Sequence, residues 1–219
     1  MSKAIVHLMR HGHVENPKGV LYERLPDFHL SEIGRRMAQR MAEYTADLDL
    51  VHLRCSPLER AQETMAPIAE RHGLEVTTDE RVIEAGNNLR GRVFTGKLTQ
   101  LLQPAVFTKL YNPFRPSWGE AYREIVARMR LAIADAAEAA EGQEALIVSH
   151  QLPIWMARLD AEGRPLVHDP RKRQCSLASI TSFTLIDGRV TKVEYAEPCI
   201  DLVPVKNRTT AKKKFVAGA

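Results

Sequence analysis

The stretch "AIVHLMRHGH", residues 4–13, begins as a short apolar run and ends on Arg10, with His11 and His13 on either side of Gly12. Its first six residues have the composition of a buried strand and are too few for a membrane span or a secretory signal. Charged and histidine residues at the end of such a strand predict a site at the carboxyl edge of a parallel sheet. Two chemistries fit this pattern: a His-x-His metal site, or an arginine and a histidine that bind and attack phosphate.

The same kind of apolar run recurs later in the chain, at residues 50–55 and 145–149. Between the runs, apolar residues follow Ser31 and Ser56 at the three- and four-residue spacing of amphipathic helices. Buried strands that alternate with amphipathic helices indicate a parallel sheet with crossover helices. We therefore expect an α/β fold, a three-layer sandwich with a mostly parallel sheet and helices on both faces.

Two segments differ from this alternation. Residues 177–186 and 189–195 flank the dipeptide Asp187-Gly188, which predicts one antiparallel hairpin at an edge of the sheet. Residues 87–116 hold three prolines and match neither the strand nor the helix pattern. An irregular segment of that length in a compact domain indicates a lid or a binding insert.

Helix boundaries are also marked in the sequence. Residues 56–59 and 117–120 both read S-x-x-E, the capping box that predicts a helix start, and the first has proline at the first helical position. Gly73 and Gly142 stand where these two helices are expected to end.

The size and composition of the chain indicate one ordinary globular domain. A chain of 219 residues with 44% hydrophobic and 26% charged residues suits one core that buries about 70% of its surface. Three cysteines without C-x-x-C spacing suggest neither a disulfide framework nor a zinc site. We expect a cytoplasmic protein with reduced thiols and no membrane partner.

The formal net charge of +4 is concentrated at the end of the chain. Residues 202–219 hold five basic side chains and no acidic one, whereas the other 201 residues hold 26 basic and 27 acidic side chains. Because a basic end is more often solvated than a binding arm, we expect no nucleic-acid partner, and tail binding to RNA or anionic lipid is the lesser alternative. The expected domain spans residues 1–204, and residues 205–219 form a basic, flexible tail.

The three predicted strands end close to residues that can carry chemistry. The first ends at Arg10 and His11, the second leads to Ser56 and, one helical turn later, Arg60, and the third ends at His150. The carboxyl ends of parallel strands share one edge of a sheet, so these side chains are expected to meet there. Arg60 alone suggests a surface arginine, but an arginine beside the free N–H groups of a helix start is a good anion site.

A metal site at His11 and His13 is the weaker hypothesis, because two ligands are too few and the strand ends add His150 but no aspartate. The sequence lacks the G-x-S-x-G motif of a serine hydrolase, which argues against that class of enzyme. In the phosphate hypothesis, two arginines neutralise a phosphoryl group while a neutral imidazole attacks it in line. Gly12 is then expected to let the ligand approach the backbone closely.

Other basic residues are expected to be structural. His7 and His52 lie within predicted strands, where a lone histidine is more often a satisfied structural residue than a ligand. Arg171, Lys172 and Arg173 form a charge run that we expect in a solvated loop.

Three segments together carry a family resemblance. They are Arg10-His11-Gly12 after an apolar strand, Ser56-x-x-x-Arg60-Ala61-x-x-Thr64 at a helix start, and Val148-Ser149-His150 at a strand end. In this order they resemble the signature segments of the histidine phosphatase superfamily, in the phosphoglycerate mutase-like branch that includes broad-specificity phosphatases. The match extends from about residue 5 to residue 183.

The resemblance implies a nucleophile and a phosphate pocket. His11 is the residue that becomes a phosphohistidine, and Arg10, Arg60 and His150 line the phosphate pocket. Asn16 comes one residue earlier than the family's asparagine and is expected to reach the phosphate as well. The resemblance implies neither a metal ion nor a cofactor.

In the family's fold the proton donor comes shortly after that fold's own third strand, in a segment like L-x-E-x-x-x-G. The stretch "RVIEAGNNLRG", residues 81–91, matches it and assigns the role to Glu84, with Glu80 as the nearest rival. His13 falls at a position that the family leaves variable, which indicates the rim of the pocket.

The stretch "IEAGNNLRGRVF", residues 83–94, lacks the basic, tyrosine-bearing E-R-H-Y-type segment of the family's phosphoglycerate mutases. The resemblance therefore favours a phosphomonoester hydrolase for a small phosphorylated metabolite over a phosphoglycerate mutase-type phosphoryl transferase. A non-catalytic phosphate-binding regulatory protein is the other alternative, although a binder has no need of the acid Glu84. Basic and aromatic residues in 87–116 suggest either a lid over an acidic, part-aromatic ester or a solvated surface. The chain is expected to be a monomer or a homodimer.

Overall fold

The computed structural model describes residues 3–86, 91, 119–140 and 142–204. Most of the expected lid, residues 87–116, and the whole basic tail, residues 205–219, lie outside the described residues, so both expectations stay predictions. None of the described helices is long and apolar enough to cross a membrane.

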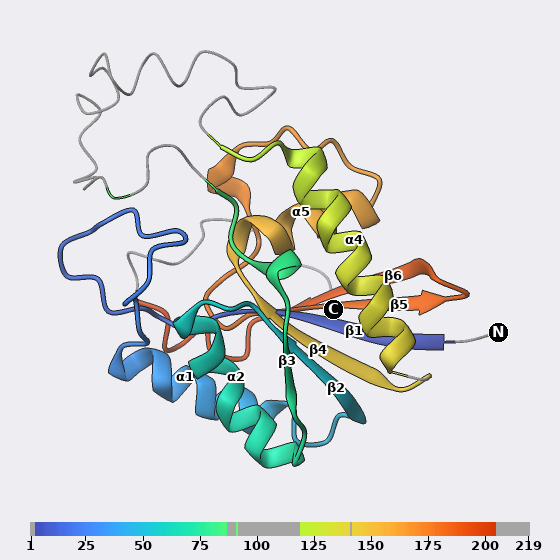
Figure 1. Ribbon diagram of the computed structural model, residues 1–219, viewed down its shortest axis with the longest axis horizontal. Coiled ribbons are helices and arrows are strands. Elements are labelled where there is room, and N and C mark those ends of the chain that lie inside the picture. Colours follow the sequence, from blue (N-terminus) through green and yellow to red (C-terminus); the bar gives the residue numbers. More distant parts are fainter. Residues whose placement is uncertain (1–2, 87–90, 92–118, 141, 205–219) are drawn as a thin grey trace.

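The described residues form a six-stranded sheet in the order β3-β2-β4-β1-β5-β6 (Figure 1). The first four strands in this order are parallel, while β5 is antiparallel to β1 and β6 is antiparallel to β5. The strand bounds are β1 Lys3–Arg10, β2 Leu50–Cys55, β3 Val76–Thr78, β4 Glu144–Ser149, β5 Ile180–Ile186 and β6 Arg189–Ala196. The predicted parallel sheet with one antiparallel edge hairpin is confirmed.

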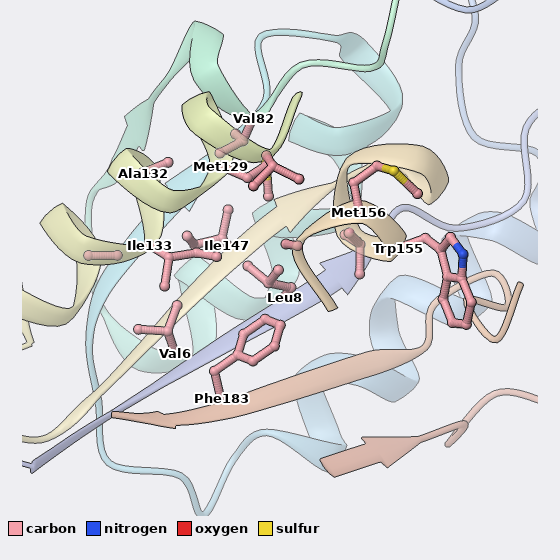
Figure 2. Close-up of a cluster of buried hydrophobic side chains, with 14 of the residues drawn as sticks. Val6, Leu8, Val82, Met129, Ala132, Ile133, Ile147, Trp155, Met156 and Phe183 are labelled. Atoms are coloured by element: carbon pink, nitrogen blue, oxygen red, sulfur yellow. The ribbon is translucent and has the colours of Figure 1, made fainter. Parts of the chain in front are cut away.

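Helices cover both faces of the sheet, as a three-layer sandwich requires (Figure 1). Helices α1 and α2 pack on one face, and α4 and α5 on the other, with the bounds α1 Glu32–Tyr44, α2 Glu59–His72, α4 Tyr122–Ala139 and α5 Gln151–Ala161. Side chains alternate along the central strand β1, so that Val6 and Leu8 join the core under α4 and α5 while Met9 joins the core under α1 and α2. Figure 2 shows the first of these cores, where Phe183 of β5 lies with Val6 and Leu8.

Several predicted boundaries are confirmed by backbone geometry. Ser31 caps α1, its hydroxyl accepting a hydrogen bond from the Gly34 amide at 3.1 Å. Gly73 ends α2 in the left-handed region, with φ of 64°. Asp187 and Gly188 both have positive φ, 49° and 75°, which is the twist that a two-residue hairpin turn requires.

The two predicted capping boxes are wrong. Helix α2 begins at Glu59 with Leu58 as its N-cap, and α4 begins at Tyr122 with Ala121 as its N-cap, and neither cap side chain bonds the helix. Ser56 lies two residues before the N-cap of α2, and its hydroxyl contacts His150 as well as the Leu58 amide, while the Glu120 carboxylate is bonded to arginines.

The register of the central strands brings three chain segments to one point. Strand β4 lies between β1 and β2, with Arg10 opposite Ser149 and Cys55 opposite Val148, so all three strands end at the same level. Backbone hydrogen bonds continue one residue further, from the His11 amide to the Ser149 carbonyl at 3.2 Å and from the Ser56 amide to the Val148 carbonyl at 3.0 Å. This edge is where a doubly wound sheet binds its ligands.

Candidate active site

His11 follows β1 directly and is only 2% exposed. Its Nδ1 lies 2.8 Å from the Gly12 carbonyl oxygen, and because a carbonyl only accepts, Nδ1 carries the proton and Nε2 keeps its lone pair. Burial, Arg60 and Arg10 hold the pKa of His11 well below its usual value. His11 is therefore a neutral imidazole near pH 7, with the tautomer that a nucleophile attacking through Nε2 needs.

Gly12 has a structural role that differs from the expected one. A Cβ on Gly12 would lie 2.8 Å from the backbone oxygen of Gly34 in α1, and a Cβ on Gly34 would lie 2.0 Å from the His13 oxygen. The Gly12 amide donates to the Thr64 hydroxyl at 3.1 Å. The absent side chain at Gly12 thus lets α1 approach the loop that carries His11, rather than admitting the ligand.

Arg60 lies in the first turn of α2 and is fully buried, contrary to a surface arginine. Its guanidinium lies 4.8 Å from the centre of the Tyr22 ring, and its Nη2 donates to the Glu23 carbonyl. Arg10, at the end of β1, donates from Nη1 to the Cys175 carbonyl at 2.7 Å. Each arginine is therefore fixed through one end of its guanidinium.

His150 follows β4 and lies against His11, with the two ring centres 5.1 Å apart. Its Nε2 is 2.7 Å from the Ser56 hydroxyl, which itself accepts from the Leu58 amide at 3.4 Å. With the Ser56 hydroxyl donating to Nε2, the proton of the ring lies on Nδ1. Burial, His11 and the two arginines lower the pKa of His150 well below its usual value, so this imidazole is also neutral.

Four buried nitrogen donors around His11 lack a hydrogen-bond partner among the described residues. They are Nε of Arg10, Nε and Nη1 of Arg60, and Nδ1 of His150. Within the residues that the structure describes, no carboxylate forms an ion pair with Arg10 or Arg60. Unpaired buried cations and donors are costly unless an anion completes them, so this cluster fits a phosphoryl group.

Glu84 comes after the short 3-10 helix Glu80–Val82 and lines the same cavity as Arg10 and His11. Its Oε1 accepts from the Ala85 amide at 2.8 Å. Burial raises the pKa of Glu84, although this hydrogen bond and the nearby arginines act against the rise. A carboxyl whose pKa is raised retains its proton to higher pH, as a general acid must. The rival Glu80 is exposed and does not line this cavity.

The cavity in front of His11 has a volume of about 350 Å³, near the lower end of the roughly 300–1,000 Å³ of small-molecule sites. Its wall combines ionisable groups with aromatic and aliphatic side chains, including Tyr22, Leu152, Tyr122 and Arg173. Space of this size and mixed polarity suits a small phosphorylated metabolite.

Two groups around the cavity were missed in the sequence. Residues 20–23, from the long segment between β1 and α1, line it, and Arg24 donates from Nε to the Glu84 carbonyl at 2.6 Å. Arg173, expected in a solvated loop with Arg171 and Lys172, also lines the cavity, whereas the other two are exposed. No local motif marks these residues, because packing against distant strand ends brings them here.

Two expected residues lie elsewhere. The Asn16 side chain bonds the Val20 backbone twice, accepting from its amide at 3.0 Å and donating to its carbonyl at 2.8 Å, and it does not line the cavity. His13 is bonded through Nδ1 to the Ser31 hydroxyl at 2.8 Å, which places it at the cap of α1 rather than on the pocket rim.

The two histidines within strands, His7 and His52, do not line the cavity. His7 is structural as expected, bonded to Ser182 at 2.7 Å and to Glu144 at 2.9 Å, whereas Nε2 of His52 has no partner among the described residues. The described residues contain no group of three or more His, Cys, Asp or Glu side chains placed to hold a metal ion.

Solved structures share this fold. A mycobacterial glucosyl-3-phosphoglycerate phosphatase superposes with a TM-score of 0.70 at 21% identity, covering 89% of this chain and 96% of that chain. A phosphoserine phosphatase from Entamoeba histolytica, solved in complex with 3-phosphoglyceric acid, gives a TM-score of 0.71 at 20% identity, covering 90% of this chain and all of that chain.

Sequence relatives identify the family. An uncharacterized protein of Mycobacterium tuberculosis is 49% identical over 193 residues, which are 88% of this chain and 96% of that protein. A probable phosphoglycerate mutase GpmB of an Enterobacter species is 27% identical over 179 residues, 80% of this chain and 83% of that protein. The family profile of the histidine phosphatase superfamily (branch 1) matches residues 6–198. The chain therefore belongs to branch 1 of the histidine phosphatase superfamily.

Proposed function

We propose that this protein hydrolyses a small phosphate monoester through a phosphohistidine intermediate on His11. The observation that carries the proposal is the cluster of unpartnered buried donors on Arg10, Arg60 and His150 around the free Nε2 of a neutral histidine. A phosphoryl group satisfies these donors, and its charge compensates the buried guanidinium groups.

In the first step, Nε2 of His11 attacks phosphorus, so that an N–P bond forms while the ester P–O bond breaks. The arginines and the Nδ1–H of His150 stabilise the charge on the non-bridging oxygens. Glu84 gives its proton to the leaving oxygen, which departs as an alcohol.

In the second step, the ionised Glu84 takes a proton from a water molecule that attacks phosphorus. The N–P bond breaks, inorganic phosphate forms, and both His11 and Glu84 return to their starting protonation states. Glu84 thus acts as acid and then as base, which a carboxyl with a raised pKa near the reacting group can do.

The alternative within the family is a phosphoglycerate mutase-type transferase, which returns the phosphoryl group to an acceptor instead of water. Relatives of both kinds are found, a probable mutase in sequence and phosphatases in structure. The segment around Glu84, residues 83–94, lacks the tyrosine-bearing E-R-H-Y-type pattern associated with mutases, which supports hydrolysis. A non-catalytic phosphate binder has no use for the raised pKa of Glu84 in the same cavity.

The proposal is tested by measuring inorganic phosphate release from a panel of phosphorylated metabolites in the presence of EDTA. We expect release by the wild type, loss in His11→Ala, and retention in the matched control His13→Gln, which changes a histidine bonded at the α1 cap. Phosphate transfer between phosphoglycerates without release would support the mutase instead. Loss of the wild-type activity in EDTA would revive the metal hypothesis.

A further inference from the structure

The cavity wall carries a second arginine besides Arg10, the side chain of Arg173. Arg173 follows the 3-10 helix Pro170–Lys172, on the segment between α5 and β5, so it reaches the cavity from a different element than Arg10 or Arg60. Arg171, two residues earlier, is exposed and paired with Asp169.

A relay of hydrogen bonds fixes the orientation of Arg173. Nδ1 of His168 donates to the Leu166 carbonyl at 2.7 Å, which leaves Nε2 of His168 as an acceptor. Nε of Arg173 donates to that atom at 2.8 Å. The ring of His168 is itself packed near Tyr122 and Trp155, with ring centres 5.8 and 6.0 Å away. The inner part of the guanidinium is thus held by protein, and its outer end is left for another partner.

The two terminal nitrogens of Arg173 form neither a hydrogen bond nor an ion pair with a described residue. None of the described carboxylates forms an ion pair with Arg173. On the cavity wall, Glu120 is bonded instead to Arg24 and Arg128, and Glu84 accepts from the Ala85 amide. A largely enclosed guanidinium with free donors is the protein's usual group for a carboxylate or a phosphate.

The scissile phosphoryl group already has its donors on Arg10, Arg60 and His150. We infer that Arg173 binds a second anionic group on the leaving group of the substrate, a carboxylate or a second phosphate, and that it determines specificity for such esters. Leu152, Pro170 and Tyr122 line the cavity with Arg173 and provide apolar contact for the carbon skeleton between the two anions. This inference rests on the proposed function, because it takes the bound ester to be the substrate. Binding of the second anion can nevertheless be measured without catalysis.

The test uses pairs of phosphonates, which keep the phosphoryl dianion and cannot be hydrolysed. Phosphonoacetate, 3-phosphonopropionate and 4-phosphonobutyrate test a carboxylate as the second anion, and each is compared with the alkylphosphonate of equal length. Alkyl bisphosphonates test a phosphate as the second anion in the same way. Calorimetric Kd values are measured for the wild type, for Arg173→Gln, and for Arg171→Gln as the matched control outside the cavity.

We expect the wild type to bind at least one compound with a second anionic group about tenfold or more tightly than the alkylphosphonate of equal length, as one charge-assisted contact allows. Arg173→Gln should remove this preference and leave the Kd of the alkylphosphonates within about threefold of the wild-type value, while Arg171→Gln should keep the preference. The second anion is identified by which compounds show the preference, the carboxylates or the bisphosphonates, and by the chain length at which they show it. Absence of a preference in the wild type, or equal weakening of both members in Arg173→Gln, overturns the inference. If the preference is present but no ester is hydrolysed, the proposed function fails and the anion subsite stands.

Discussion

The hydroxyl of Ser56 lies 2.7 Å from Nε2 of His150 and joins the end of β2 to the end of β4 inside the site. The same oxygen accepts from the Leu58 amide at 3.4 Å, and donation of its proton to Nε2 places the proton of the ring on Nδ1. The contact sets which nitrogen of His150 faces the phosphoryl pocket as a donor, the unpartnered Nδ1. Ser56 therefore acts through His150 as a positioning residue.

Replacing Ser56 by alanine should lower kcat about tenfold, equivalent to about 1.4 kcal/mol of transition-state stabilisation. The reason is that His150 then loses the partner that fixes its tautomer. The matched control is Ser182→Ala, which removes a serine–histidine contact of the same 2.7 Å length at His7, away from the cavity. Equal kcat losses in both variants would show that Ser56 only supports the fold.

The role of Glu84 is tested by the leaving group. Glu84→Gln should slow esters of poorly acidic alcohols about 100-fold or more, and p-nitrophenyl phosphate much less, because p-nitrophenolate departs with little protonation. Steady-state kcat/KM for the two ester types measures this difference, because kcat/KM reports formation of the phosphoenzyme, whereas kcat also includes its hydrolysis, which is the same for both esters. Glu80→Gln, at the exposed rival position, should leave both rates near wild type. If Glu84→Gln slows both types equally, the proton donor is another residue.

The pKa shifts predict the two limbs of the pH profile. The lowered pKa of His11 means that kcat/KM rises with pH through a pKa below the usual 6.5, as the imidazole becomes neutral. The raised pKa of Glu84 means that kcat/KM for poor leaving groups falls through a pKa above the usual 4.5, as the proton is lost.

The pH prediction is checked by dividing the wild-type profile by that of Glu84→Gln. Ionisation of the substrate phosphate, with a pKa of about 6, is common to both and cancels. The quotient should retain the fall at higher pH that belongs to Glu84. The rise at low pH that belongs to His11 is common to both profiles and should cancel. A quotient independent of pH contradicts the assignment of Glu84.

Glu120 connects the two segments that position Glu84. Its carboxylate accepts from Arg24 Nη2 at 2.9 Å and from the Gly86 amide at 3.3 Å, while Arg24 also holds the Glu84 carbonyl. Arg128 of α4 donates to the same carboxylate at 2.7 Å. Glu120→Gln should therefore lower kcat/KM about tenfold for poor leaving groups and less for p-nitrophenyl phosphate.

A structural control separates this effect from lost stability. Glu162 likewise accepts from two arginines, Arg158 and Arg164, and does not line the cavity. Urea unfolding should show Glu120→Gln and Glu162→Gln each losing about 1–2 kcal/mol. Only the first should change the dependence of kcat/KM on the leaving group, and the same change in both would contradict a positioning role for Glu120.

Local sequence signals predicted the fold and the centre of the site. Apolar runs and helical spacing mark β1, β2 and β4, and because parallel strands end at a common edge, they bring His11, Arg60 and His150 together. The dipeptide at Asp187 predicted the hairpin because its backbone requirement is local. Strand β3, of three residues, has too few residues for a periodicity and was missed.

Long-range packing determined what the sequence did not predict. Ser56 resembles a helix cap in its own segment, and only the register of β2 against β4 shows that its hydroxyl serves His150. Arg173 is the third residue of a charge run whose first two residues, Arg171 and Lys172, are exposed. The Arg173 side chain lines the cavity because His168 accepts its Nε hydrogen bond. Gly12 faces α1 because Gly34, far along the chain, approaches it.

The central claim is tested most directly by trapping the phosphoenzyme. Wild-type protein incubated with a panel of ³²P-labelled phosphoryl donors and quenched should carry label that is acid-labile and alkali-stable, as expected for phosphohistidine. The label should be absent from His11→Ala and present in His13→Gln. No label on the wild type across the panel, or label that persists in His11→Ala, would contradict nucleophilic catalysis by His11.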